Sequence, residues 1–119
     1  MLAPGGLLYL QTPFVIGRHD APYDYWRFTG DGLKQLLSSA GFELDRVAPA
    51  VGAGTGTYRI AVELVAVLAS SLARRTYLPV KGVAAFALWP LRWLDVVTLD
   101  GPESWRIPGG FLALARKPS

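Results

Sequence analysis

Cysteine is absent from this chain, and histidine occurs only once. The absence of cysteine excludes disulfides, thiolate metal ligands and a cysteine nucleophile, and it is typical of a reducing compartment. The single histidine, His19, cannot form a metal site by itself, so we expect no metal. Basic charge is also sparse, because the net charge is only +3 and no basic stripe is present apart from the pair Arg74 and Arg75. We therefore expect no nucleic-acid partner.

A secretory leader and long hydrophobic runs are missing as well. Residues 1–6 contain no charged leader followed by an apolar run, and they lead straight into a Pro-Gly-Gly turn. Two largely apolar stretches, residues 60–78 and 80–97, are each interrupted by charged residues or proline before reaching about 18 apolar positions. The sequence therefore predicts no membrane span, and it indicates a cytoplasmic location.

The residues that are present predict one α/β domain with a sizeable core, since 51% are hydrophobic and only 18% are charged. Residues 7–10 form a short apolar run that is typical of a strand buried on both faces. A helix is predicted to begin at Thr29 or Asp31 and to end near Gly41. Its apolar face consists of Leu33, Leu36, Leu37 and Ala40.

A second strand follows this helix at residues 42–47, where apolar and acidic residues alternate. The order strand, helix, strand favours parallel strands joined by a right-handed crossover. We then expect a glycine-rich hinge and a helical insertion over residues 51–109, in which Pro90 kinks or divides the second helix. Residues 110–119 are predicted to add a final strand at the edge of the sheet.

Several motifs in the first half of the chain occur in an order known from one family. They are Leu2-Ala3-Pro4-Gly5-Gly6 before the first strand, Pro22-Tyr23-Asp24-Tyr25-Trp26-Arg27-Phe28-Thr29 in the loop, and Ala40-Gly41-Phe42 before the second strand. Residues 2–47 thereby resemble the C-terminal half of class I S-adenosylmethionine-dependent methyltransferases, in particular the small type 11 domains. The resemblance implies a partial Rossmann-like sheet, mostly parallel, with S-adenosylmethionine as the cofactor.

In this family, an acidic residue and a glycine-rich turn follow the first strand of the domain and bind the cofactor. Residues 1–6, which precede the first predicted strand of this chain, do not contain that motif. We expect that motif to lie upstream of Met1, so that residues 1–119 form a single partial domain that is inactive alone. Residues 50–56 are rich in glycine, but Ala50 stands at the acidic position. No acidic residue that ends a strand follows at the required distance, so this turn is interpreted as a hinge.

The loop at residues 12–29 is the predicted site for the methyl acceptor, because ligands of open α/β sheets bind beyond the carboxyl ends of the strands. His19 is the candidate general base, and Asp20 either orients it or takes the proton itself. A surface histidine is the alternative. The candidate acceptor-binding residues are Thr12, Pro13, Phe14, Tyr23, Tyr25, Trp26 and Arg27.

Two roles remain open for several of these side chains. The aromatic residues of the loop either wall the acceptor pocket or fill the core at the end of the sheet. Arg27 either forms an ion pair with Asp24 that shapes the loop or binds an anionic group of the acceptor.

The predicted function is thus methyl transfer to a small-molecule acceptor, with this chain as the acceptor side. The alternative is a non-enzymatic module that binds a partner or a membrane surface through its apolar helices. Residues 60–98, which include Trp89 and Trp93, would carry that contact or a self-association, with Trp105 nearby. More often, such helices pack on the sheet, on one another or on a second subunit.

Overall fold

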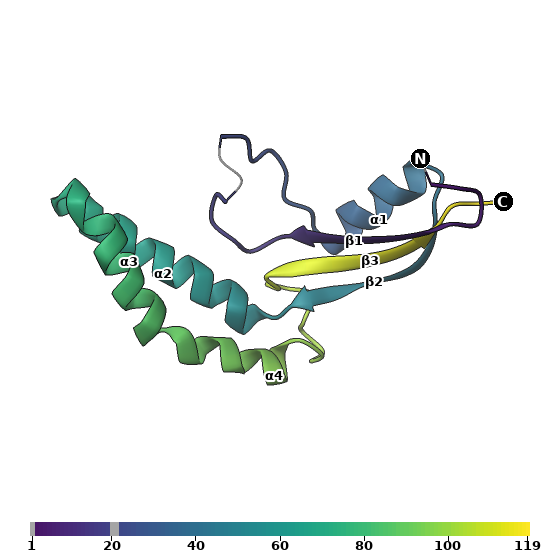
Figure 1. The fold of residues 1–119 in the computed structure, drawn as a ribbon. Helices are drawn as coiled ribbons and strands as arrows, with labels where there is room; N and C mark the ends of the chain where they lie inside the picture. Colours follow the sequence, from purple (N-terminus) through teal and green to yellow (C-terminus); the bar gives the residue numbers. More distant parts are fainter. Residues whose placement is uncertain (1, 20–21) are drawn as a thin grey trace.

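The fold is built on a three-stranded sheet. The computed structural model describes residues 2–19 and 22–119, and within them the strands are β1 (Leu7–Pro13), β2 (Glu43–Val51) and β3 (Gly110–Arg116). The order in the sheet is β1-β3-β2, and β3 runs antiparallel to both neighbours (Figure 1).

The predicted mostly parallel sheet with the last strand at its edge is therefore wrong. β1 and β2 do point in the same direction, since each is antiparallel to β3, but they are not neighbours. The most deeply buried strand takes the centre: Phe111, Ala113 and Ala115 are all at most 1% exposed. An apolar run such as residues 111–115 predicts burial, but it does not specify which strands pair or in which direction.

Helix α1 (Gly30–Ser39) covers one face of this sheet (Figure 1). The Thr29 hydroxyl accepts a hydrogen bond from the Gly32 amide at 3.0 Å and caps the helix, and Gly41 takes a positive φ of 80° just beyond its end. Leu33 and Leu37 are buried against β3, which confirms the predicted helix and its orientation. Leu36 and Ala40, which were expected on the same buried face, are exposed at its rim.

The opposite face of the sheet is open in the described part of the chain. Along β1, exposed and partly buried residues alternate, and Leu7 and Tyr9 are largely exposed. The prediction that residues 7–10 are buried on both faces is therefore wrong. β1 also forms one edge of the sheet, and its residues pair only with β3.

The insertion folds into a helical hairpin that projects from the sheet (Figure 1). It consists of α2 (Ala53–Leu72), η1 (Arg74–Thr76), α3 (Tyr77–Ala87), η2 (Trp89–Leu94) and α4 (Asp95–Thr98). We call residues 53–98 the arm. Pro90 lies in the 3-10 segment that separates α3 from α4, which confirms that it divides the second helix.

The arm makes the molecule elongated. Its principal extents are 57 × 34 × 18 Å, and its radius of gyration is 17.2 Å, whereas a compact domain of this length would have a radius of about 13.5 Å. Both chain termini lie at the end of the sheet remote from the arm (Figure 1). Among the described helices, none combines the length and the apolar character needed to cross a bilayer.

Candidate functional site

The carboxyl ends of β1 and β2 lie side by side with the start of β3. Gly109 connects them, because its amide donates to the Val51 carbonyl at 2.7 Å and its carbonyl accepts from the Phe14 amide at 3.0 Å. A Cβ on Gly109 would lie 2.6 Å from Cγ1 of Val51, so no side chain fits there. The end of the sheet, the start of the loop and the start of α2 are thus held together.

Two adjoining cavities open at this end of the sheet. One, of about 400 Å³, is lined by Thr12, Pro13, Val51 and Gly110 among others, and the second, of about 300 Å³, lies between the loop and the arm. Both are lined by Ile16, His19 and Arg59. Volumes of this size suit a small molecule.

Thr12 lines the first cavity, but its hydroxyl is buried on the side of β1 that faces the core, together with Leu8 and Leu10. It is 8% exposed, and its Oγ1 has no hydrogen-bond partner among the described residues. A buried hydroxyl without a partner costs roughly 1–3 kcal/mol.

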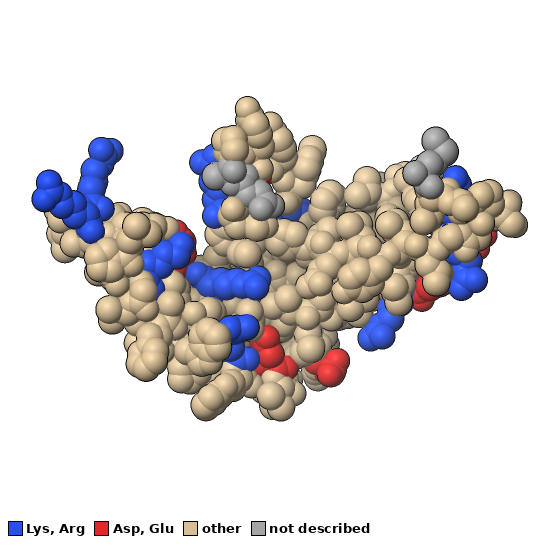
Figure 2. All heavy atoms as spheres, viewed as in Figure 1, with Lys and Arg blue, Asp and Glu red and all other residues tan. Residues whose placement is uncertain are grey.

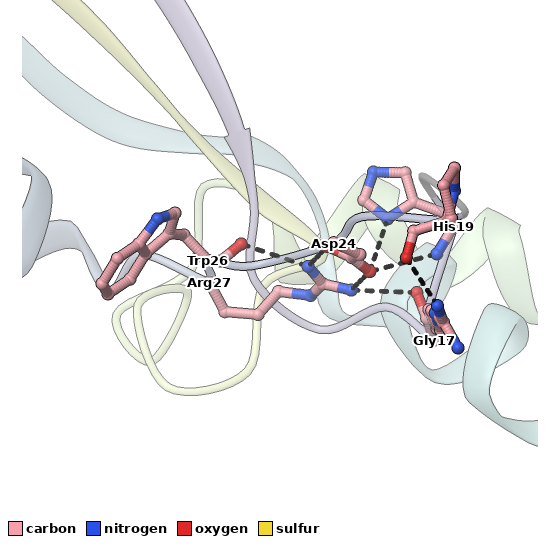
Figure 3. Close-up of polar contacts among 7 residues, drawn as sticks. Gly17, His19, Asp24, Trp26 and Arg27 are labelled. Carbon is pink, nitrogen blue, oxygen red and sulfur yellow. Dashed lines mark hydrogen bonds and ion pairs between the residues drawn. The ribbon is translucent and has the colours of Figure 1, made fainter.

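An ion pair inside the loop holds the shape of the site (Figure 3). The Arg27 guanidinium donates to both carboxylate oxygens of Asp24, with Nη2 2.6 Å from Oδ2, and also to the Gly17 carbonyl at 3.1 Å. These bonds from Arg27 hold the pKa of the Asp24 carboxyl well below its usual range. The predicted ion pair is therefore confirmed, and these hydrogen bonds of Arg27 lie within the loop.

The same carboxylate orients His19. The His19 amide donates to Asp24 Oδ2 at 3.2 Å, and the ring Nδ1 lies 3.5 Å from that oxygen (Figure 3). The residue predicted for this role, Asp20, lies outside the described residues, and Asp24 is the described carboxylate beside the imidazole. Its own contact with Arg27 keeps Asp24 ionised, so it remains a hydrogen-bond acceptor for His19.

The predicted aromatic wall is not assembled around the cavities. Tyr23, Tyr25 and Trp26 are each about 70% exposed, and the rings of Tyr23 and Tyr25 stack on each other at 5.8 Å. Phe14 instead contacts Phe111 of the core, with ring centroids 5.7 Å apart. Of the predicted residues, the cavities thus bring together Thr12, Pro13 and His19.

A second ionic cluster forms the wall contributed by the arm. Lys81 of α3 lies 2.7 Å from the Glu63 carboxylate of α2, and the Tyr77 hydroxyl also donates to Glu63. The hydrogen bond from Lys81 lowers the pKa of Glu63, and Glu63 in turn raises the pKa of Lys81. Both side chains line the second cavity, so the pair fixes α3 against α2 beside the loop.

The glycine-rich turn at residues 50–56 does not form a ligand cradle. A Cβ on Gly52 would lie 2.4 Å from Oδ1 of Asp95, and one on Gly54 would lie 2.5 Å from the Leu91 carbonyl. Asp95 also accepts hydrogen bonds from the Thr55 amide at 2.8 Å and from its hydroxyl at 2.6 Å, which satisfies the start of α2. These glycines allow η2 and α4 to approach α2 closely.

Arg59 is the site residue that the sequence interpretation missed. It lies in the second turn of α2, partly buried, where it lines both cavities. The sequence does contain a signal for this residue, because Arg59 follows the end of β2 by eight residues. The carboxyl end of β2 lies at the same end of the sheet as that of β1. In the described part of the chain, no group of three or more potential ligands could hold a metal ion.

Comparison with known proteins gives no relative for this arrangement. No family model, no curated protein and no solved structure matches the chain.

Proposed function

We propose that this chain forms the acceptor-binding part of an S-adenosylmethionine-dependent methyltransferase that acts on a small molecule. The proposal rests first on the motifs of residues 2–47. Its main structural support is the pair of cavities at the carboxyl ends of β1 and β2, which both contain His19 and Arg59.

The residues of the site have distinct roles in this proposal. Arg59 binds an anionic group of the acceptor, since guanidinium forms paired bonds with carboxylate or phosphate. Thr12 forms part of the wall of the same cavity. His19, oriented by Asp24, takes the proton from an acceptor that starts protonated. Arg27 is a positioning residue, because it acts through Asp24.

S-adenosylmethionine would supply an electrophilic methyl group to the acceptor. Residues 50–56 do not fit this cofactor, because Asp95 already caps the start of α2. Atoms of Asp95 and Leu91 also occupy the space next to the glycines that a ligand would need. In this proposal, the cofactor is therefore bound by a part of the protein other than residues 50–56. This chain contributes binding and orientation of the acceptor, which can supply much of the rate acceleration in a transfer reaction.

Mapping of small anionic probes by NMR tests the proposal. Phenyl phosphate and benzoate, added to the labelled chain, are expected to shift the amide resonances of Gln11, Ile16, His19, Arg59 and Gly110, all of which line the cavities. Benzyl alcohol, which carries no charge, is the matched neutral probe and should shift them much less. Shifts confined to the open face of the sheet, or equal shifts from all three probes, would overturn the assignment of the site.

Calorimetry with S-adenosylmethionine addresses the cofactor separately. The chain by itself is expected to show no binding heat, because the glycine-rich turn is closed by Asp95. Saturable binding to this chain would contradict the division of roles, even if the acceptor probes bind as expected.

A further inference from the structure

The arm exposes an unusual amount of apolar side chain along its length. Leu72 is 91% exposed and Phe86 is 86% exposed, although both belong to helices. Other large apolar residues of the arm that are at least half exposed are Leu64, Val67, Leu68, Leu78, Val83, Trp93, Val96 and Val97. An exposed surface of this kind marks an interaction site.

Tryptophan and phenylalanine concentrate on one side of α3 and η2. Phe86, Trp89, Pro90 and Trp93 line one shallow groove of about 540 Å³, so their side chains share a face. Arg92 lies against Trp89, with its guanidinium carbon 4.3 Å from the ring centroid. Aromatic rings next to basic groups are typical of the interface between lipid head groups and acyl chains.

The net positive charge of the arm indicates which kind of surface could cover its apolar side chains. Residues 53–98 contain five basic and two acidic residues. The two acids are already engaged, Glu63 by Lys81 and Tyr77, and Asp95 by Thr55. Arg74 and Arg75 lie in the turn at the tip, where basic side chains project from the surface (Figure 2), and no described carboxylate pairs with them. A second copy of the arm would therefore bring like charge, whereas an anionic surface would complement it.

We infer that the arm docks on the surface of an anionic lipid bilayer. The apolar side chains of α3 and η2 enter the head-group region, Trp89 and Trp93 lie at the interface, and Arg74 and Arg75 contact lipid phosphates. The contact is peripheral, because no described helix could cross the bilayer. This inference concerns the arm alone and does not depend on the methyl-transfer proposal.

Vesicle co-sedimentation of the full chain tests the inference. Vesicles of phosphatidylcholine with phosphatidylglycerol are expected to bind the chain, and vesicles of phosphatidylcholine alone to bind it weakly. The double variant Arg74→Gln/Arg75→Gln should weaken binding about 30-fold, since each cation near an anionic membrane contributes about a fivefold gain in affinity. The matched control is Arg46→Gln/Arg116→Gln, which removes the same charge from the sheet and should leave binding unchanged.

A second pair of variants tests the apolar contact. Leu72→Gln/Phe86→Gln removes two exposed arm side chains and should also reduce binding by at least tenfold. Leu7→Gln/Tyr9→Gln removes two exposed side chains from the open face of the sheet and should have no effect. Thermal unfolding followed by circular dichroism shows whether each variant is folded.

The inference is overturned by any of three results with folded protein. These are no binding to the anionic vesicles at low salt, binding that the arm variants leave intact, or binding that the sheet variants abolish. A chain that dimerises through the arm and ignores vesicles would give the first result, and sedimentation velocity would identify it.

Discussion

The carboxylate of Asp95 closes the start of α2 by accepting hydrogen bonds from both the amide and the hydroxyl of Thr55, 40 residues earlier in the chain. This contact joins the two ends of the arm next to the sheet. It also explains why a glycine-rich turn at this place does not act as a cofactor loop, because a protein carboxylate already occupies the position that a ligand phosphate or carboxylate would take.

Removal of this cap should destabilise the protein. Asp95→Ala leaves the amide of Thr55, a residue only 5% exposed, without its acceptor, and we expect a loss of about 2 kcal/mol in the free energy of unfolding. Urea denaturation measures this loss. Asp100→Ala, at an exposed position nearby, makes the same change of charge and should cost little. Equal losses in the two variants would show that the cap contributes nothing specific.

Two glycines of the arm should respond oppositely to alanine. A Cβ on Gly54 would collide with the Leu91 carbonyl at 2.5 Å, so Gly54→Ala should cost roughly 1–3 kcal/mol. A Cβ on Gly82, in α3, would have no neighbouring atom within 4 Å. Gly82→Ala should therefore stabilise the helix by roughly 0.5–1 kcal/mol. Thermal melts of the two variants check the signs, and a stable Gly54→Ala protein would contradict the close packing of η2 on α2.

The ion pair between Asp24 and Arg27 should make the loop sensitive to acid. Because the pKa of Asp24 is lowered in the folded protein, its ionised form stabilises the loop at all pH values above the ordinary aspartate range, near pH 4. That stabilisation is lost as the pH falls further, through the lowered pKa. Hydrogen exchange of the His19 amide, which donates to Asp24, reports the loss.

Arg27→Ala should raise the pKa of Asp24 back toward the ordinary range, as measured by the carboxyl 13C shift. The matched control is Lys34→Ala, which breaks an exposed pair with Asp31 at the same three-residue spacing and should leave the loop unchanged. An Asp24 titration that is the same in the wild type and in Arg27→Ala would refute the role assigned to Arg27.

Arg59 should determine the preference of the cavity for anions. Arg59→Ala is expected to weaken binding of phenyl phosphate about tenfold, in line with the loss of a charge-assisted hydrogen bond, and to leave the weaker binding of benzyl alcohol unchanged. The control is Arg46→Ala on β2, which removes the same charge from an exposed position outside both cavities. NMR titration of both variants gives the dissociation constants.

Local signals in the sequence were enough to locate the strands and α1. Thr29 caps the helix through its own hydroxyl, Gly41 ends it with a positive φ, and Pro90 interrupts the arm, so each feature depends on the residue itself and its near neighbours. The strand order was not accessible in this way. Placement of β3 between β1 and β2 depends on contacts between residues about 60 to 110 positions apart, such as Leu7 with Arg116, which no local pattern encodes.

The site was only partly predictable for a similar reason. Thr12 lies in the last residues of β1 and His19 follows that strand, and this local position is sufficient to place them at the cavities. Arg59 reaches the same cavities from α2, 40 residues after His19. The exposure of Tyr23, Tyr25 and Trp26 depends on the conformation of the whole loop. The sequence favours the neighbouring Asp20 as the partner of His19, whereas in the structure the Asp24 carboxylate lies beside the imidazole.

A comparison of small-molecule extracts tests the central claim, methyl transfer to an anionic acceptor, most directly. Deletion of the gene in its native cell should cause one anionic metabolite to accumulate while its partner, heavier by one CH2 unit, disappears. Expression of the intact gene or of Arg46→Ala should restore the heavier compound, and expression of Arg59→Ala should not. Metabolite profiles that are identical with and without the gene, or full restoration by Arg59→Ala, would contradict the account.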